Sequence, residues 1–246
     1  MESDLRRLLF SAICCFCLML VPLQGQQPAG NSSPDYKALV VGAFGQDQEL
    51  VNGKQYYNKH PRSMGHPYLL EGWSRQGSVT IRGRIYNQVW LKYDIHAQHV
   101  EVEYRTINGA ENRVILVGDR LDEFRIENNL FKRLKLEEAT GEQFYQVIGE
   151  GSFVFYIRWE KILVPVSGDS RFFEEFTSPK RNYLIELDGK VYPFHNKSSF
   201  VKLFPKAIQK DLKRIIRSNL LQLRSASAVQ LELFLLAAEK LINGGD

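Results

Sequence analysis

Between Ser78 and Phe194, apolar and polar residues alternate with a period of two. This pattern is typical of antiparallel strands that bury one face and turn the other outward. The clearest strand is predicted over His99–Arg105. Its apolar face would carry Val100, Val102 and Tyr104, and its opposite face would carry Glu101, Glu103 and Arg105.

Turn residues separate the predicted strands. Gly83, Asn108-Gly109 and Asp188-Gly189 each lie between two strand-like runs, as tight hairpins require. The other predicted strands are Ser78–Arg82, Ile85–Tyr93, Arg113–Val117, Glu123–Ile126, Leu130–Leu136, Gln143–Gly149, Ser152–Val164, Tyr183–Leu187 and Lys190–Phe194. Roughly ten strands without intervening helical periodicity predict a mainly β fold, an antiparallel meander forming a barrel, half-barrel or sandwich.

The pattern changes after His195 and predicts a C-terminal α-helical appendage. Ser198 or Ser199 is expected to cap a short helix that stops before Pro205. Apolar residues then recur with the helical period over Lys206–Asn219, and a last, largely apolar helix is predicted over about Ala228–Ile242.

The N-terminus predicts export. Arg6 and Arg7 precede an apolar run over Leu8–Leu23, the order of a secretory signal peptide. The run is shorter than the roughly 20 residues of a membrane-spanning helix, so we expect cleavage near Gly25. Lipidation of a cysteine is the competing interpretation, but Ser11–Ile13 before the first cysteine fits such a motif poorly.

Cleavage would remove every cysteine, since Cys14, Cys15 and Cys17 are the only three and lie in the apolar run. A mature chain without thiols excludes disulfides, thiolate zinc sites and cysteine nucleophiles. We therefore expect a signal peptide over residues 1–25, a flexible tether over 26–35, an antiparallel β domain over 36–195 and the helical appendage over 196–246.

The formal net charge is only +4, but the positive charge is concentrated in one segment. Between Lys197 and Arg224, eight cationic residues accompany a single acid, Asp211. On a helix over Lys206–Asn219 the cations share one face: Lys206, Lys210, Lys213, Arg214 and Arg217. Such a face could contact lipid phosphates or acidic glycans, or it could simply be solvated. Nucleic acid is not expected as a partner.

Two further groups of residues are candidates for chemistry. Asp94, His96 and His99 carry metal-binding groups, but they lack a defined ligand spacing, and a solvated polar turn between strands explains them better. Strand aromatics could line a cavity for an apolar ligand or simply form the core. They are Trp73, Tyr86, Trp90, Tyr93, Tyr104, Phe144, Tyr145, Phe153, Phe155, Tyr156 and Trp159. Since no catalytic or cofactor motif occurs, we assign no catalytic residue, metal ligand or cofactor.

Several segments together resemble a group of uncharacterised exported proteins from Bacteroidota, over about Leu50 to Asn219. These segments are Val51–Gly53 with Tyr56, Gly65–Tyr68, Gly77–Val79, Tyr86, Leu91–Ile95, Lys197–Pro205 and Lys213-Arg214. The resemblance implies a compartment and a host lineage, and no activity or ligand. Turn glycines, strand aromatics and a helix cap make up these segments, which suggests that they maintain the fold.

The sequence thus predicts an exported, non-enzymatic binding or structural protein of the bacterial envelope, periplasmic or extracellular. It would hold an apolar ligand or contact an anionic surface. The alternative is an envelope hydrolase that uses carboxylate or histidine residues in a concavity of the sheet. A deep cleft with convergent His, Asp or Glu side chains would favour the hydrolase, and a filled core or dry aromatic cavity would favour the binding protein.

Overall fold

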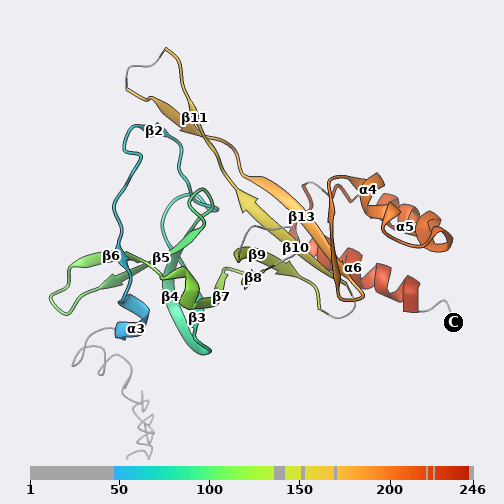
Figure 1. The fold of residues 1–246 in the computed structure, drawn as a ribbon, viewed down its shortest axis with the longest axis horizontal. Helices are drawn as coiled ribbons and strands as arrows, with labels where there is room; N and C mark the ends of the chain where they lie inside the picture. The colour runs from blue at the N-terminus through green and yellow to red at the C-terminus, as the bar shows by residue number, and fades with distance from the viewer. Residues whose placement is uncertain are drawn as a thin grey trace, which may run out of the picture. The chain divides into compact units, whose positions relative to one another are not determined.

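A computed structural model describes residues 47–135, 142–150, 153–168, 171–219, 221–223 and 225–243 of the 246-residue chain (Figure 1). The predicted signal peptide, its cysteines, the tether and the start of the β domain lie outside the described residues.

Eleven strands form one large sheet, and all neighbouring pairs in it are antiparallel. Across the sheet the strands follow the order β1 (Lys54–Gln55), β6 (Glu111–Ile115), β5 (His99–Arg105), β4 (Arg84–Asp94), β3 (Arg75–Ile81), β7 (Leu121–Ile126), β8 (Asn129–Leu134), β9 (Gln143–Ile148), β10 (Phe153–Glu160), β13 (Lys180–Leu187) and β14 (Lys190–Phe194). The predicted mainly β class is confirmed.

The strand order departs from a simple meander where strands that are not consecutive in the chain pair, namely β1 with β6, β3 with β7 and β10 with β13. β7 does not pair with β6, which precedes it, but returns to pair with β3 on the side away from β4. The sheet is open, with β1 and β14 at its ends, and no closed barrel is found among the described residues.

The predicted turns form as expected. Gly83, Gly109 and Gly189 have φ values of 78°, 83° and 73° in the β3–β4, β5–β6 and β13–β14 hairpins. Such positive φ values cost glycine little because it has no Cβ. The strands β5 and β14 have the bounds that the alternation predicts.

The long run predicted over Ser152–Val164 does not form one strand. It is interrupted after Glu160, and β11 (Leu163–Pro165) joins a second, three-stranded sheet with β12 (Glu174–Phe176) and β2 (Ser63–Met64). In this sheet β12 and β2 are parallel. Short strands such as β1, β2 and β12 show no alternation long enough to be recognised in the sequence.

Three helices follow β14, in addition to the short α3 (Gln48–Val51). They are α4 (Lys197–Lys202), α5 (Lys206–Ser218) and α6 (Ala228–Asn243), close to the predicted bounds. The predicted cap of α4 is wrong in one respect. Asn196 is the N-cap, and Ser199 is the N3 residue that completes a capping box with it.

The buried apolar residues form two clusters. One lies among β3 to β9 and includes Tyr93, Phe124 and Phe131, the last two stacked at 4.7 Å between ring centroids. The other joins β10, β13 and β14 to the helices, and Phe200 of α4 lies 5.1 Å from Phe194 of β14. Trp159 packs against both clusters. The C-terminal helices therefore pack against the sheet and share a core with it.

Candidate functional site

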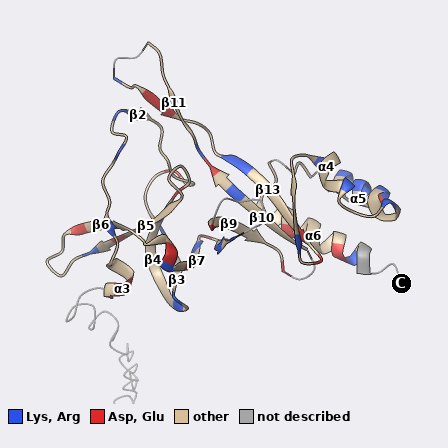
Figure 2. Cartoon of the chain, viewed as in Figure 1, with Lys and Arg blue, Asp and Glu red and all other residues tan. Residues whose placement is uncertain are grey.

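The five cations predicted to contact an anionic surface lie together on α5 (Figure 2). All five are exposed: Lys206, Lys210, Lys213, Arg214 and Arg217. We call this set the basic face of α5. The helical period predicted from the sequence therefore places these residues as expected.

The opposite side of α5 is fixed in the core. Leu212 and Ile216 are buried, and Ile208 and Ile215 pack against the same cluster. Rotation of α5 that exposed its apolar side would break this packing. The basic face is consequently turned toward solvent by the fold itself.

Little of the charge on this face is neutralised within the protein. Arg214 pairs with Asp211 at 2.9 Å, and Arg214 stays largely exposed. Among the described residues, no carboxylate lies within ion-pair distance of Lys206, Lys210, Lys213 or Arg217. Lys202 at the end of α4 is also exposed. Arg224, the last cation of the predicted stripe, lies outside the described residues.

Five of the eleven predicted strand aromatics are buried, and Tyr86, Tyr104 and Trp159 pack partly buried against the apolar clusters. The buried ones are Tyr93, Phe144, Tyr145, Phe153 and Phe155, whereas Trp73 and Trp90 are 85% and 52% exposed. Tyr93 contacts Phe124 and Phe131 in edge-to-face geometry, as rings in an ordinary β core do. These aromatics therefore fill space between strands.

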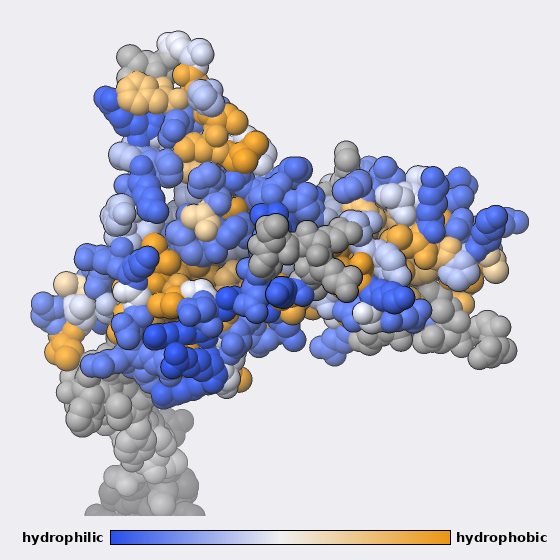
Figure 3. Space-filling view, viewed as in Figure 1, coloured by the Kyte–Doolittle hydropathy of each residue, from blue (hydrophilic) through white to orange (hydrophobic). Residues whose placement is uncertain are grey.

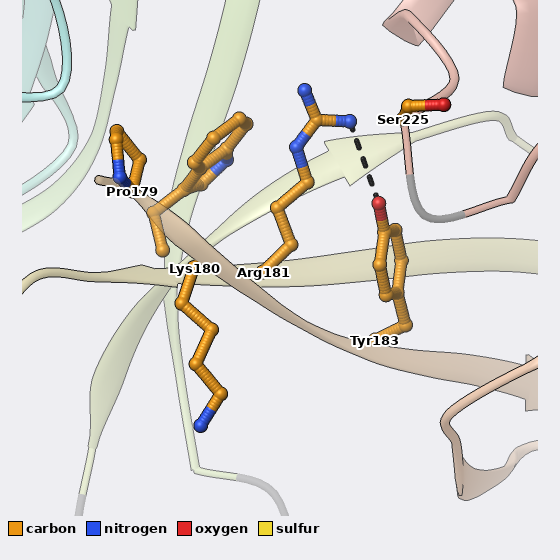
Figure 4. A pocket seen from close by; sticks show the side chains of 6 residues that line it. Pro179, Lys180, Arg181, Tyr183 and Ser225 are labelled. Carbon is orange, nitrogen blue, oxygen red and sulfur yellow. Dashed lines mark hydrogen bonds between the residues drawn. The ribbon is translucent and has the colours of Figure 1, made fainter. Parts of the chain in front are cut away.

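Aromatics from this set line two cavities, a small one through Trp73 and Tyr93 and a second one through Trp159. The second cavity measures about 580 Å³ and lies beside β10 and β13, and its lining residues are Trp159, Pro179, Lys180, Arg181, Tyr183 and Ser225 (Figure 4). The Arg181 guanidinium stands over the Trp159 ring at 4.4 Å and donates to the carbonyl of Ala226 at 2.7 Å. The Lys180 ammonium pairs with Glu160 at 3.0 Å. The lining is thus a mixture of rings and paired cations.

The candidate metal ligands are only partly brought together. His99 Nε2 lies 3.7 Å from Asp94 Oδ2, but His96 turns its Nδ1 to the carbonyl of Lys161 at 3.1 Å. In the place of His96, Glu101 approaches His99 Nε2 at 3.1 Å. Glu101 is not among the ligands predicted from the sequence, although the period of two places it on the same face of β5 as His99.

Glu101 was expected on an outward strand face, yet its side chain is fully buried. The segment before β3 covers this polar face of the sheet. Tyr68 from that segment donates its hydroxyl to Glu101 Oε2 at 3.3 Å, and Arg113 of β6 approaches the same oxygen at 3.5 Å. Burial, the hydrogen bond with Tyr56 and the charge of Glu101 raise the pKa of Tyr68, which keeps its phenol protonated as a donor.

Two segments that carry the resemblance to exported proteins meet here. Ile95 donates its backbone N–H to Pro67 at 3.0 Å, and Leu69 donates to Tyr93 at 2.9 Å. These bonds fasten Gly65–Tyr68 to the end of β4, next to Asp94. The segments thus position a polar cluster as well as supporting the fold.

None of the described helices has the length and apolar character needed to cross a bilayer. Comparisons with protein-family models, with curated proteins and with solved structures find no match for this chain.

Proposed function

We propose that this chain is an exported, non-enzymatic binding protein of the bacterial envelope that contacts anionic lipid headgroups through the basic face of α5. The observation that carries the proposal is the arrangement of this helix. Its apolar side is anchored in the core, while its exposed cations have almost no carboxylate partners among the described residues.

The charge chemistry supports an anionic surface as the partner. Each Lys or Arg near an anionic membrane contributes about 1 kcal/mol of attraction, which falls off over a Debye length. Several cations on one rigid face act on the same surface at once. The space-filling view shows hydrophilic residues in this region together with hydrophobic ones (Figure 3).

Export is part of the proposal and is supported by the predicted signal peptide and by the resemblance to exported Bacteroidota proteins. The half-barrel expected from the alternation is also part of the proposal. Large open antiparallel sheets twist, and this twist can curve the sheet toward a half-barrel.

One observation favours the alternative, an envelope hydrolase. Asp94, His99 and Glu101 converge on the polar face of β4 and β5. A hydrolase also needs room for a substrate beside such groups. The small cavity lined by Tyr68, Lys92 and Tyr93 measures about 10 Å³, which is room for about one water molecule and not for a substrate. Binding therefore fits the described residues better than hydrolysis.

The experiment is vesicle co-sedimentation of the mature protein with phosphatidylglycerol or phosphatidylcholine vesicles. We expect binding to the anionic vesicles that weakens with added salt. Lys210→Glu, Lys213→Glu and Arg217→Glu together should weaken it at least about a hundredfold, at about 1 kcal/mol per lost cation.

The matched control reverses three exposed cations elsewhere on the sheet, Lys54→Glu, Arg125→Glu and Lys190→Glu. Both triple variants change the net charge equally. Binding that is unchanged in the α5 variant, or that is lost equally in the control, would rule out the basic face as the contact.

A further inference from the structure

We propose that Asp94, His99 and Glu101 form a binding site for a divalent transition-metal ion, for which zinc is the best chemical match. This site lies on the polar face of β4 and β5, on elements other than α5, and it does not depend on the proposed function.

The strand register brings the three side chains together. Asp94 ends β4 and pairs directly with His99, the first residue of β5. Glu101 lies two residues further along β5 and so projects from the same face as His99. The short connection between the two strands therefore fixes all three on one face of a hairpin.

The donor atoms have the spacing of a shared ion. His99 Nε2 lies 3.1 Å from Glu101 Oε1 and 3.7 Å from Asp94 Oδ2, and the three donor groups lie within 4.8 Å of one another. Ligands bound to zinc at about 2.0–2.2 Å in tetrahedral geometry are separated by roughly 3.2–3.6 Å. Small side-chain rotations would bring all three donors onto one ion.

The outer oxygens of both carboxylates are held by other groups. Asp94 Oδ1 accepts from the backbone N–H groups of His96 and Ala97 at 2.9 and 2.7 Å. Glu101 Oε2 accepts from Tyr68 and faces Arg113. The inner oxygens are left pointing toward His99. Hydrogen bonds to the outer atoms of ligating carboxylates are the usual support of a metal site.

The charges around the inner oxygens favour a cation. The Glu101 side chain is fully buried and that of Asp94 is 7% exposed, and burial of two neighbouring carboxylates is costly without a positive partner. Arg113 reaches only the outer oxygen of Glu101. The Lys161 ammonium donates to the carbonyl of His66 at 2.8 Å, and the Lys92 ammonium lies over the ring of Tyr68. Among the described residues, only His99 faces both inner oxygens.

The donor set selects the type of ion. One imidazole and two carboxylates suit zinc and neighbouring transition metals better than calcium, which prefers six to eight oxygen ligands. Three protein ligands leave one tetrahedral position for water. The His99 side chain is 20% exposed and gives that position a route to solvent.

The test is titration of chelator-treated mature protein with zinc, followed by calorimetry and by elemental analysis after gel filtration. We expect one zinc per chain. His99→Asn and Asp94→Asn should each weaken binding at least about tenfold, since even supporting residues of metal sites contribute that much. Zinc should also raise the unfolding temperature of the wild type but not of these variants.

His96→Asn is the matched control, because His96 is a neighbouring histidine outside the proposed donor set. It should bind zinc as the wild type does. Because Glu101 is fully buried, its substitution can impair folding, and the more exposed His99 provides the decisive variant. Absence of zinc after gel filtration, or equal loss in His96→Asn and His99→Asn, would overturn the site.

Discussion

Gly77 shows how a single residue can be fixed by the backbone next to it. It lies within β3 at an irregularity in the pairing with β4, and a Cβ there would stand 2.0 Å from the carbonyl oxygen of Arg125 on β7. The sequence suggested a turn glycine at this position. The structure instead places it in a strand, where close approach of a neighbouring backbone requires it.

Gly77→Ala is therefore expected to destabilise the protein by about 3 kcal/mol, because β3 and β7 must separate to admit the methyl group. Urea unfolding would measure the difference. Gly118→Ala is the control, since a Cβ at Gly118 meets nothing within 4 Å. Equal stability of the two variants would contradict this explanation.

At the scale of elements, α4 connects β14 to the basic helix and depends on its cap. Asn196 accepts from the backbone N–H of Ser199 at 2.9 Å, and the Ser199 hydroxyl accepts from the backbone of Asn196 at 3.0 Å. Phe200 and Val201 of this helix are buried against the sheet. The cap therefore fixes the turn from which α5 starts.

Asn196→Ala should cost about 1 kcal/mol of stability, the usual contribution of an N-cap side chain. Ser198→Ala makes the comparison, because Ser198 is exposed and takes no part in the capping box. Chemical denaturation should show a lower midpoint for the first variant and little change for the second. The reverse order would mean that Ser198 is the effective cap.

At the scale of the whole described fold, the two buried clusters share one sheet. The pairing β8–β9–β10 is continuous, and Trp159 on β10 packs against both clusters. Its indole N–H donates to Gln146 of β9 at 2.7 Å, and Gln146 in turn donates to Asn129 of β8 at 2.8 Å. These contacts couple the clusters through the middle of the sheet.

We therefore expect one cooperative unfolding transition. Phe131→Ala in one cluster and Phe200→Ala in the other should each lower its midpoint by removing a fully buried ring, a loss of about 3–5 kcal/mol. Near- and far-ultraviolet circular dichroism should report the same midpoint in each variant. Two separate transitions would show instead that the clusters unfold independently.

The sequence by itself determined the local elements. The alternation predicted the exact bounds of β5 and β14, and turn glycines predicted the hairpins. The 3.6-residue period predicted α5 and its basic face. These features depend on neighbours in the chain, through backbone conformation and side-chain direction. A single sequence records such short-range requirements directly.

Only the tertiary structure decided which distant segments meet. Three features depend on contacts between residues far apart in the chain. They are the pairing of β7 with β3, the place of β11 in a second sheet and the burial of Glu101 beside Tyr68. A period of two states that His99 and Glu101 share a face, but it does not state what covers that face. Because of the covering segment, a carboxylate that the pattern places on a solvated face is buried beside Asp94 and His99. Burial is a property of packing and not of local pattern.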